Sequence, residues 1–367
     1  MKCRIEMDKQ DKNIAFALYI HPSKDERVYY QEAEILRESG FVVSIVSILD
    51  AKEKLNSVRQ KISYLATEVT KTNADIIISD TPLSVFSAWR VKRRSSKSVK
   101  ICYDITEWYP SVKNLSHVPF YQKPIRFLLL LFASFLAGIL ADAFIFGEED
   151  KARPFQLFFG KKRSVMLPYY ASKKYMDAKF ECPQEKNALT MMYSGSLAKD
   201  KGIEKVIAVA EKCAEMRPEK EFVLKVMSGA DLHYYSHRNN LKIDCIGYQA
   251  YPEFCKTLKV ADIFFDLRKI DSETTRCMPI KLFYYMACGR PVVYSNLKAI
   301  RKGVPEIDSF AILVNPVNVD DVAVRVLHLI EDVTEYNACC SAAFRLFDSK
   351  YNWESVSGRL VELVNRL

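Results

Sequence analysis

The residues best suited to chemistry stand in two short stretches of the chain. In the first, the apolar run 189–193 ends at Ser194-Gly195-Ser196, and apolar residues recur at helical spacing from Ile203 onward. A strand, a turn of small residues and a helix start bring several backbone N–H groups to one point, which attracts an anion. Lys199 and Lys201 add positive charge there. The alternative is an ordinary strand–helix connection with two surface lysines.

The second stretch, residues 279–293, reads PIKLFYYMACGRPVV. Pro279 suits the first position of a helix, and Gly289 suits its end. Lys281 and Leu282 then fall in the first helical turn. A helix amino end with a lysine in its first turn attracts a nucleotide diphosphate. The simpler alternative is a well-capped helix of an α/β sheet that binds no ligand.

Both stretches need a scaffold of alternating strands and helices, and apolar runs typical of buried strands recur along the whole chain. The runs form two series, 14–20, 41–48, 75–79, 100–103, 143–146 and 164–167, then 189–193, 222–227, 243–246, 262–266, 291–294 and 311–314. Helical or loop material separates them. This pattern predicts an α/β protein whose parallel sheets are wrapped by helices, with functional loops at the carboxyl ends of the strands.

The two series predict two Rossmann-like, doubly wound domains, and a length of 367 residues suits two domains. We place the first at residues 1–170 and the second at 189–340. A polar linker is expected over 171–188. The last segment, 341–367, is expected to form a C-terminal helix that packs back toward the first domain.

The composition is that of a soluble globular protein, 49% apolar and 27% charged, with a formal charge of +9. The basic excess lies in the first half, where six basic residues cluster at Arg90, Lys92, Arg93, Arg94, Lys97 and Lys100. This cluster is a solvated helix end or a face for anionic lipid or a phosphorylated substrate. No recognised motif accompanies it, so nucleic-acid binding is not expected.

The ten cysteines show no C-x-x-C spacing, and no signal peptide is recognisable. They are therefore expected to be reduced thiols of a cytoplasmic protein. The chain has no D-x-D sequence and no His/Cys cluster with metal spacing. Neither a metal nor another cofactor is expected.

The stretch 127–141, FLLLLFASFLAGILA, has fifteen residues without a charge. It is too short to span a bilayer comfortably and leads directly into a predicted strand. We predict a helix of the protein core. The alternative is a helix that dips into a membrane surface, with the basic cluster nearby.

Residues 281–293, KLFYYMACGRPVV, resemble the donor-site signature of the retaining glycosyltransferases of family 4 with the GT-B fold, K-L-F-E-Y-M-A-x-G-x-P-V-V. Further stretches resemble this family in the right order. They are 25–28 with Gly40 and Val43, 103–110 (YDITEWYP), 194–196 with Lys201-Gly202, 247–251 (GYQAY) and Ala261-Asp262. The resemblance runs from about residue 14 to 360. It implies two Rossmann-like domains that face each other across a cleft, an acceptor-binding domain followed by a donor-binding domain.

The resemblance also implies an activity, the transfer of a hexosyl group from a nucleotide-sugar to a glycan or lipid-linked glycan with retention of configuration. On the donor side it implies Ser194, Gly195, Ser196, Gly247, Tyr248, Arg276, Leu282 and Tyr284, with Lys201, Arg268 and Lys281 meeting the charge of the leaving diphosphate. In the first domain, strand-end loops would offer His21, Asp25, Arg27, Thr106 and Glu107 to the acceptor. Trp108 and Tyr109 are expected to anchor their loop. The expected location is the cytoplasm, with peripheral contact to the inner face of the membrane.

Three positions depart from the family pattern. Tyr284 stands where a glutamate usually holds the donor ribose, Thr106 where histidine is common, and Ser196 where the phosphate loop usually has arginine. A phenol cannot supply the bidentate grip of a carboxylate on two hydroxyls. Two alternatives follow: a degenerate GT-B protein that binds nucleotide or serves as a scaffold subunit, and a sugar-nucleotide epimerase of the same shape.

Overall fold

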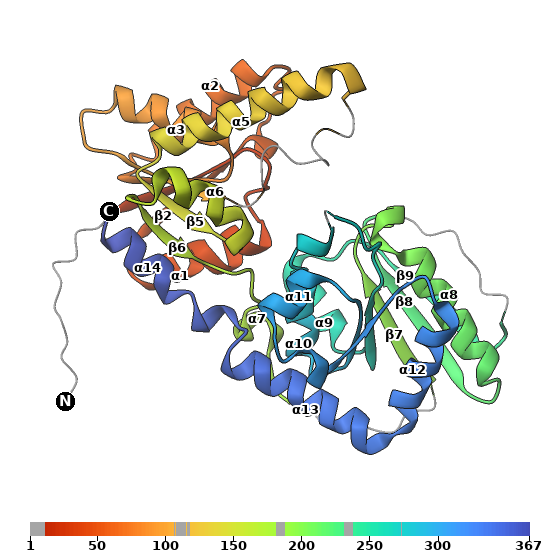
Figure 1. The fold of residues 1–367 in the computed structure, drawn as a ribbon. Helices are drawn as coiled ribbons and strands as arrows, with labels where there is room; N and C mark the ends of the chain where they lie inside the picture. The colour runs from red at the N-terminus through yellow and green to blue at the C-terminus, as the bar shows by residue number, and fades with distance from the viewer. Residues whose placement is uncertain are drawn as a thin grey trace, which may run out of the picture. The chain divides into compact units, whose positions relative to one another are not determined.

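The computed structural model describes residues 12–105, 107, 115, 118–180, 188–230, 238–272 and 274–367. Thr106, Trp108 and Tyr109 lie outside these residues. The chain divides into two compact units (Figure 1), the first made of Met1–Tyr169 with Val356–Leu367, the second of Tyr170–Ser355. Residues 341–355 belong to the second unit and 356–367 to the first.

The first unit is built on a six-stranded parallel sheet in the order β2-β1-β3-β4-β5-β6. The strands are β1 (Asn13–Leu18), β2 (Val42–Ser47), β3 (Ile76–Ser79), β4 (Lys100–Ile105), β5 (Ala143–Phe146) and β6 (Arg163–Met166). The helices are η1 (Val28–Glu32), α1 (Ala33–Glu38), η2 (Ile48–Asp50), α2 (Val58–Lys71), α3 (Pro82–Arg94), η3 (Phe120–Gln122), α5 (Lys123–Leu140), α6 (Glu149–Phe159) and α14 (Gly358–Asn365).

Local sequence signals explain where several of these helices begin. The Ser57 and Thr81 side chains accept hydrogen bonds from backbone N–H groups three residues later, at the starts of α2 and α3. Each start is a capping box, which satisfies backbone donors that a helix amino end leaves unpaired. Pro82 at the first position of α3 fixes the backbone angle that the helix needs.

Helices cover both faces of the first sheet. Side chains of α2, α3, α5 and α6 join Ala15, Ala17, Ile77, Tyr103 and Phe144 in one buried core. The connection from β1 to β2 runs through α1, and α1 packs against α14. Because chain order moves from β1 to β2 on one side and to β3 on the other, the switch point of this sheet lies between β1 and β3.

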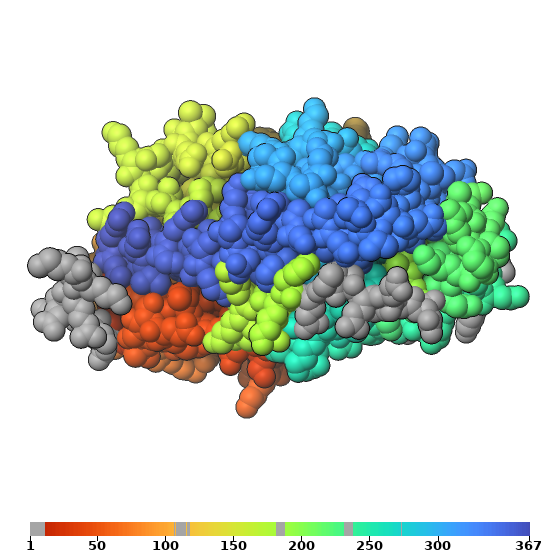
Figure 2. Space-filling view, turned by 90° about the horizontal axis from the view of Figure 1, so that it is seen from below, coloured from red at the N-terminus to blue at the C-terminus, as the bar shows by residue number. Residues whose placement is uncertain are grey.

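The second unit repeats this design with a sheet in the order β12-β11-β10-β7-β8-β9. Its strands are β7 (Ala188–Ser194), β8 (Glu221–Met227), β9 (Leu241–Ile246), β10 (Ile263–Asp266), β11 (Val292–Ser295) and β12 (Ala311–Val314). Its helices are α7 (Lys173–Met176), η4 (Lys199–Lys201), α8 (Ile203–Met216), α9 (Tyr251–Leu258), η5 (Thr274–Arg276), α10 (Lys281–Ala287), α11 (Lys298–Gly303), η6 (Ile307–Ser309), α12 (Val319–Glu331), α13 (Val333–Ser349) and η7 (Trp353–Ser355). The outer side of α13 is visible in blue in Figure 2.

The switch point of the second sheet lies between β7 and β10, which pair in parallel through Ile263–Met191 and Phe265–Tyr193. In open α/β sheets this place, at the carboxyl ends of the strands, is where ligands bind. A ligand site of this unit is therefore expected at the loops that follow β7 and β10.

The predicted class is confirmed: both sheets are parallel and doubly wound, and each apolar run predicted as a strand forms one. One prediction is wrong. The stretch 127–141 is not a core helix, because in α5 the buried side chains are limited to Ser134, Ala137 and Gly138, while Leu128, Leu129 and Phe132 are more than half exposed. The neighbouring helices cover one side of α5, and an unbroken apolar sequence could not reveal which side.

Candidate functional site

A cationic group of side chains lies at the switch point of the second unit, with Lys281 at its centre. The Lys281 Nζ donates a hydrogen bond to the backbone carbonyl of Ser194 at the end of β7. It lies 3.8 Å from a carboxylate oxygen of Asp266 at the end of β10, and 5.2 Å from the centre of the Tyr193 ring. The first turn of α10 thus holds an ammonium group at the ends of the two strands that flank the switch point.

Gly195 makes this close approach possible. Its φ is +143°, a backbone conformation that side chains with a Cβ rarely adopt. A Cβ at this position would lie 2.5 Å from the Lys281 Nζ. The glycine that was predicted for a phosphate loop therefore also makes room for the lysine.

Gly202, which follows η4, also allows a close backbone contact. Its φ is +79°, and a Cβ there would lie 1.9 Å from the backbone oxygen of Leu267. The start of α8 consequently packs directly on the loop after β10. This contact brings Lys201 and Arg268, which are far apart in sequence, to the same edge of the sheet.

Asp266 is the buried carboxylate that contacts both Arg268 and Lys281. Its buried carboxylate accepts from Arg268 Nε at 2.8 Å, from Arg268 Nη2 at 2.5 Å and from the Tyr294 hydroxyl at 2.6 Å. Burial alone would raise the pKa of Asp266, but Lys281, Arg268 and the Tyr294 hydroxyl outweigh it, and the pKa is lowered. Two cations thus share one buried carboxylate, which leaves a net positive charge at this edge of the sheet.

Burial and the neighbouring charges also change the pKa of Lys281. The pKa of Lys281 is lowered, first by burial and then by the charges of Arg268 and Lys201, while Asp266 opposes the shift. A cation that burial and neighbouring cations disfavour gains from the arrival of an anion. This makes the group around Lys281 a receptor for negative charge.

Other predicted donor-side residues lie nearer the surface. Ser196 is exposed, and Lys201 forms an ion pair with Asp200 at 2.9 Å. Arg276 is exposed on η5. Gly247 and Tyr248 follow the edge strand β9, and the Tyr248 side chain is 83% exposed.

Leu282 and Tyr284 are buried rather than presented at this edge. Lys281 and Tyr285 lie on the side of α10 that faces β7, where the Tyr285 and Ser194 hydroxyls are 2.8 Å apart. Tyr284 instead packs edge-on against Tyr251 and Phe254 of α9, and its hydroxyl donates to that of Tyr251 at 3.4 Å. Leu282 is fully buried. The aromatic side chain at position 284 thus fills the space beside α9.

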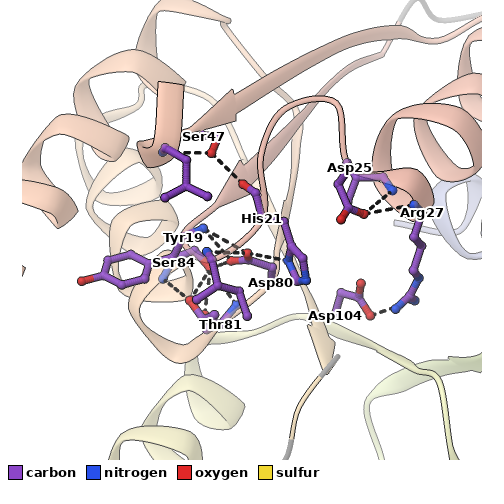
Figure 3. A network of polar contacts seen from close by, with 12 residues as sticks. Tyr19, His21, Asp25, Arg27, Ser47, Asp80, Thr81, Ser84 and Asp104 are labelled. Carbon is purple, nitrogen blue, oxygen red and sulfur yellow. Dashed lines mark hydrogen bonds and ion pairs between the residues drawn. The ribbon is translucent and has the colours of Figure 1, made fainter. Parts of the chain in front are cut away.

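In the first unit, a histidine–carboxylate pair lies at the switch point (Figure 3). His21 Nδ1 is 3.0 Å from Asp80 Oδ2, and the Asp80 carboxylate also accepts from the backbone N–H groups of Tyr19 and Ile20 and from the Ser84 hydroxyl. Burial lowers the pKa of His21, but the hydrogen bond to Asp80 and the negative charges of Asp25, Asp80 and Asp104 outweigh it, so the pKa is raised. Asp80 thus fixes the ring, and half-buried His21 takes up a proton more readily than a free histidine.

Arg27 joins three elements beside this pair. Its guanidinium is buried, with Nη2 3.0 Å from Asp104 of β4, Nε 2.5 Å from Glu32 of η1, and Cζ 4.0 Å from the centre of the Tyr169 ring. Asp25 accepts from the backbone N–H groups of Arg27 and Val28 and so starts the π-helical turn η1. Such turns are often found at functional sites.

One guanidinium faces two buried carboxyl groups in this cluster. Burial raises the pKa of Glu32 to about 8, against the opposing charge of Arg27, and burial also raises the pKa of Asp104. Both carboxyl groups therefore hold a proton more readily than they would in water, while the charge of Arg27 opposes the shift in each. Of the remaining acceptor-side predictions, Glu107 is half-buried and Thr106 lies outside the described residues.

The sequence analysis missed Asp80, Asp266 and Tyr285, and passed over Glu32. Asp80 and Asp266 had a usable signal, since each is a carboxylate at the carboxyl end of a predicted buried strand. Glu32 and Tyr285 had none, because each stands in an ordinary helical pattern. Among the residues that the structure describes, no three His, Cys, Asp or Glu side chains are grouped so that they could hold a metal ion.

Two doubly wound units with parallel six-stranded sheets match the GT-B class of fold. Three solved structures share it over almost the full length of this chain. Sucrose-phosphate synthase from Thermosynechococcus elongatus is 13% identical, with a TM-score of 0.66 over 97% of this chain and 98% of that one. HepE of Anabaena, in complex with UDP-glucose, is 14% identical, with a TM-score of 0.61 over 97% and 100%. A glycosyltransferase from Rickettsia africae is 13% identical, with a TM-score of 0.64 over 97% and 98%.

The family comparison is more specific. Residues 188–332 match the family Glycosyl transferases group 1. This range includes both stretches that the sequence predicts to attract a phosphate. A search of curated proteins found no match. The resemblance predicted from the sequence is confirmed in this region: residues 188–332 of the second unit match a group 1 glycosyltransferase domain, and the chain as a whole has the GT-B fold. Together these matches support a glycosyltransferase enzyme.

Proposed function

We propose that this glycosyltransferase moves a sugar from a nucleotide-sugar to a hydroxyl of a glycan or lipid-linked glycan, without a metal ion and with retention of configuration. The observation that carries the proposal is the pair Lys281 and Arg268 on one buried carboxylate at the switch point of the second unit, with the charge of Lys201 acting on Lys281. A nucleoside diphosphate is the anion that this position in a doubly wound sheet suits. That HepE binds UDP-glucose in the same fold makes UDP the first nucleotide to test.

Each donor-side group has a distinct task in the reaction. Lys281, which loses charge-stabilising water on burial, faces the diphosphate, while Arg268 is held rigid by its two bonds to Asp266. As the sugar–phosphate bond breaks, its electron pair moves to the diphosphate, where fixed positive groups stabilise the new charge. Gly195 has no side chain and so leaves the space in which the Lys281 ammonium stands.

On the acceptor side, His21, Asp25, Arg27, Thr106 and Glu107 are proposed to contact the acceptor glycan. The acceptor oxygen forms the new bond to the anomeric carbon on the face that the diphosphate leaves. Its proton passes to a phosphate oxygen of the departing group, so this route needs no carboxylate base. The proposed location is the cytoplasm, where nucleotide-sugars would be the donors.

The test is the thermal stability of the purified protein with UDP, GDP, ADP, CMP and their sugars, in the presence of EDTA. A nucleotide that binds the folded state alone stabilises it by about 2.7 kcal/mol at a hundredfold excess over its dissociation constant. We expect one base to raise the midpoint in wild type, and the Lys281→Met variant to lose most of that shift. The exposed Lys242→Met variant is the matched control and should keep it. No shift with any nucleotide would reject the proposed donor site.

A second candidate function is a GT-B subunit that binds nucleotide but does not turn it over. The packing of Tyr284 in the core favours it, because the side chain cannot offer a carboxylate to the donor ribose. A thermal shift combined with neither transfer nor hydrolysis of the matching nucleotide-sugar would support this function. Release of an epimerised nucleotide-sugar would instead indicate the epimerase.

A further inference from the structure

An exposed apolar face covers α5, the preceding η3 and the end of α6 in the first unit. Its side chains are 38% (Leu131) to 87% (Phe120) exposed. They are Phe120, Tyr121, Ile125, Phe127, Leu128, Leu129, Leu131, Phe132, Phe135, Ile139, Leu157 and Phe158. Phe135 and Phe158 touch edge to face at 5.6 Å, so the two helices share one continuous face, called here the α5–α6 face. Contiguous apolar surface of this extent marks an interaction site rather than ordinary surface.

The α5–α6 face is held firmly by the rest of the unit. Ser134, Ala137 and Gly138 are buried on the opposite side of α5, and a Cβ at Gly138 would lie 2.4 Å from the Phe159 ring. Lys162 Nζ donates to the backbone carbonyls of Gly138, Ile139 and Ala141 at 2.6 to 2.8 Å. The carboxyl end of α5 is thereby fixed, and its apolar side is presented outward.

The segment Phe120–Leu140 is long and apolar enough to cross a membrane, with a mean hydropathy of 1.8 in an 18-residue window, of which 17% is buried. Its place in the sheet argues against a crossing. α5 connects β4 to β5, which are direct neighbours in the same sheet. Its second half also packs on α3 and α6. A spanning helix would have to leave these contacts, whereas a helix that lies along a surface keeps them.

The charges around the face indicate what that surface is. Residues 120–141 contain no Asp or Glu, and Lys123 and Arg126 begin the helix. Lys161 is exposed and Lys162 binds the last turn of α5, so both lie at its other end. Further basic side chains stand at the end of α3, which packs on α5; Arg93 and Arg94 are exposed there. A basic frame around an apolar face complements an anionic lipid bilayer.

We propose that the α5–α6 face binds the surface of an anionic lipid bilayer, with α5 lying in the plane of the interface and the basic residues at its ends on lipid headgroups. An apolar protein partner or a second copy of the chain would use the apolar side chains but would have no need of the basic frame. The inference rests on the first unit alone and goes beyond the proposed donor chemistry. An enzyme held at the membrane in this way would meet acceptors that carry a lipid.

The test is sedimentation of the full chain with vesicles of POPC alone and of POPC with 30% POPG, at low and high salt. We expect binding to the anionic vesicles to be roughly tenfold tighter, and the difference to disappear at high salt. Leu128→Glu combined with Phe132→Glu should weaken binding to both kinds of vesicle by roughly tenfold or more. Arg93→Gln combined with Arg94→Gln should remove only the advantage of POPG.

Matched controls separate the α5–α6 face from general effects of charge. Leu49→Glu with Val317→Glu changes two exposed apolar residues elsewhere and should bind like wild type. Equal binding of all variants, no pelleting with POPG, or a dimer in light scattering that Leu128→Glu disrupts would overturn the proposal. The nucleotide-induced thermal shift of each variant is measured in parallel. Wild type that shows the nucleotide shift but does not pellet with POPG vesicles contradicts this inference alone, and wild type that pellets but shows no shift contradicts the donor site alone.

Discussion

The contact between Lys281 and the end of β7 leads to a quantitative prediction for Gly195→Ala. The new Cβ would lie 2.5 Å from the Lys281 Nζ, so the ammonium has to move away and give up its hydrogen bond to the Ser194 carbonyl. Moving the ammonium itself requires little free energy, because Nζ is the end of a flexible side chain. The loss of a hydrogen bond from a charged donor costs about 1.5–3 kcal/mol.

A second cost comes from the backbone. Position 195 has a φ of +143°, and a residue with a Cβ is strained there by roughly 1–3 kcal/mol. The two costs together predict that Gly195→Ala lowers the free energy of unfolding by about 4 kcal/mol. The measurement is urea denaturation at pH 7. Gly358→Ala is the matched control, since a Cβ there meets open space, and it should change the free energy by less than about 1 kcal/mol.

A double-mutant cycle separates the two costs. In a Lys281→Met background the hydrogen bond is already absent, so Gly195→Ala should cost about 2 kcal/mol, which is the backbone strain alone. The coupling between the two positions is then about 2 kcal/mol. Strict additivity would refute the conclusion that Gly195 makes room for Lys281. A Gly195→Ala variant as stable as the Gly358→Ala control would refute the backbone argument as well.

Two further predictions concern Glu32 and Tyr284. The pKa of Glu32 is about 8 in the folded protein and 4.5 in the unfolded chain. Between these pH values, folding therefore takes up a proton. As pH rises through this range, Glu32 lowers the free energy of unfolding by about 1.4 kcal/mol per pH unit. In urea denaturation from pH 5.5 to 7.5, the free energy of unfolding of Glu32→Gln should rise relative to that of wild type by about this amount per pH unit. If the difference in free energy between the two proteins does not change with pH, Glu32 is ionised throughout. Tyr284→Glu should lower stability by roughly 3–5 kcal/mol, because it removes a buried ring and buries a carboxylate, whereas Tyr284→Phe should cost about 1 kcal/mol or less. Wild-type stability of Tyr284→Glu, or a gain of turnover, would show that the side chain at 284 reaches the donor.

Much of the fold could be predicted because its signals are local. Buried parallel strands are short apolar runs, so β3 and β5 are legible in the sequence as IIIS and AFIF. Helix starts such as that of α3 carry their own caps. The signature around α10 placed Lys281 in the first helical turn, as the structure has it. Pro279 is not the first helical residue, however, because α10 begins at Lys281 and Ile280 is its N-cap.

Other features depend on neighbours that are distant in the chain. Asp80 and His21 are 59 residues apart, and the parallel pairing of β1 with β3 is what brings their loops together. The contact of Gly202 with Leu267 likewise follows from the order of β7 and β10. Neither strand order nor loop path is encoded in a local pattern, so these pairs are visible only in the folded chain.

By itself, the sequence determined an α/β protein of two doubly wound units, its glycosyltransferase signature and the residue types that meet a diphosphate, since hydrophobic period and motif spacing act over a few residues. The tertiary structure alone decided which side of each element is covered. It placed Tyr284 in the core and Tyr285 at the switch point, although the two are adjacent. It also left one side of α5 exposed, although both sides are apolar. Burial depends on what packs against a residue, and that is a property of the assembled fold.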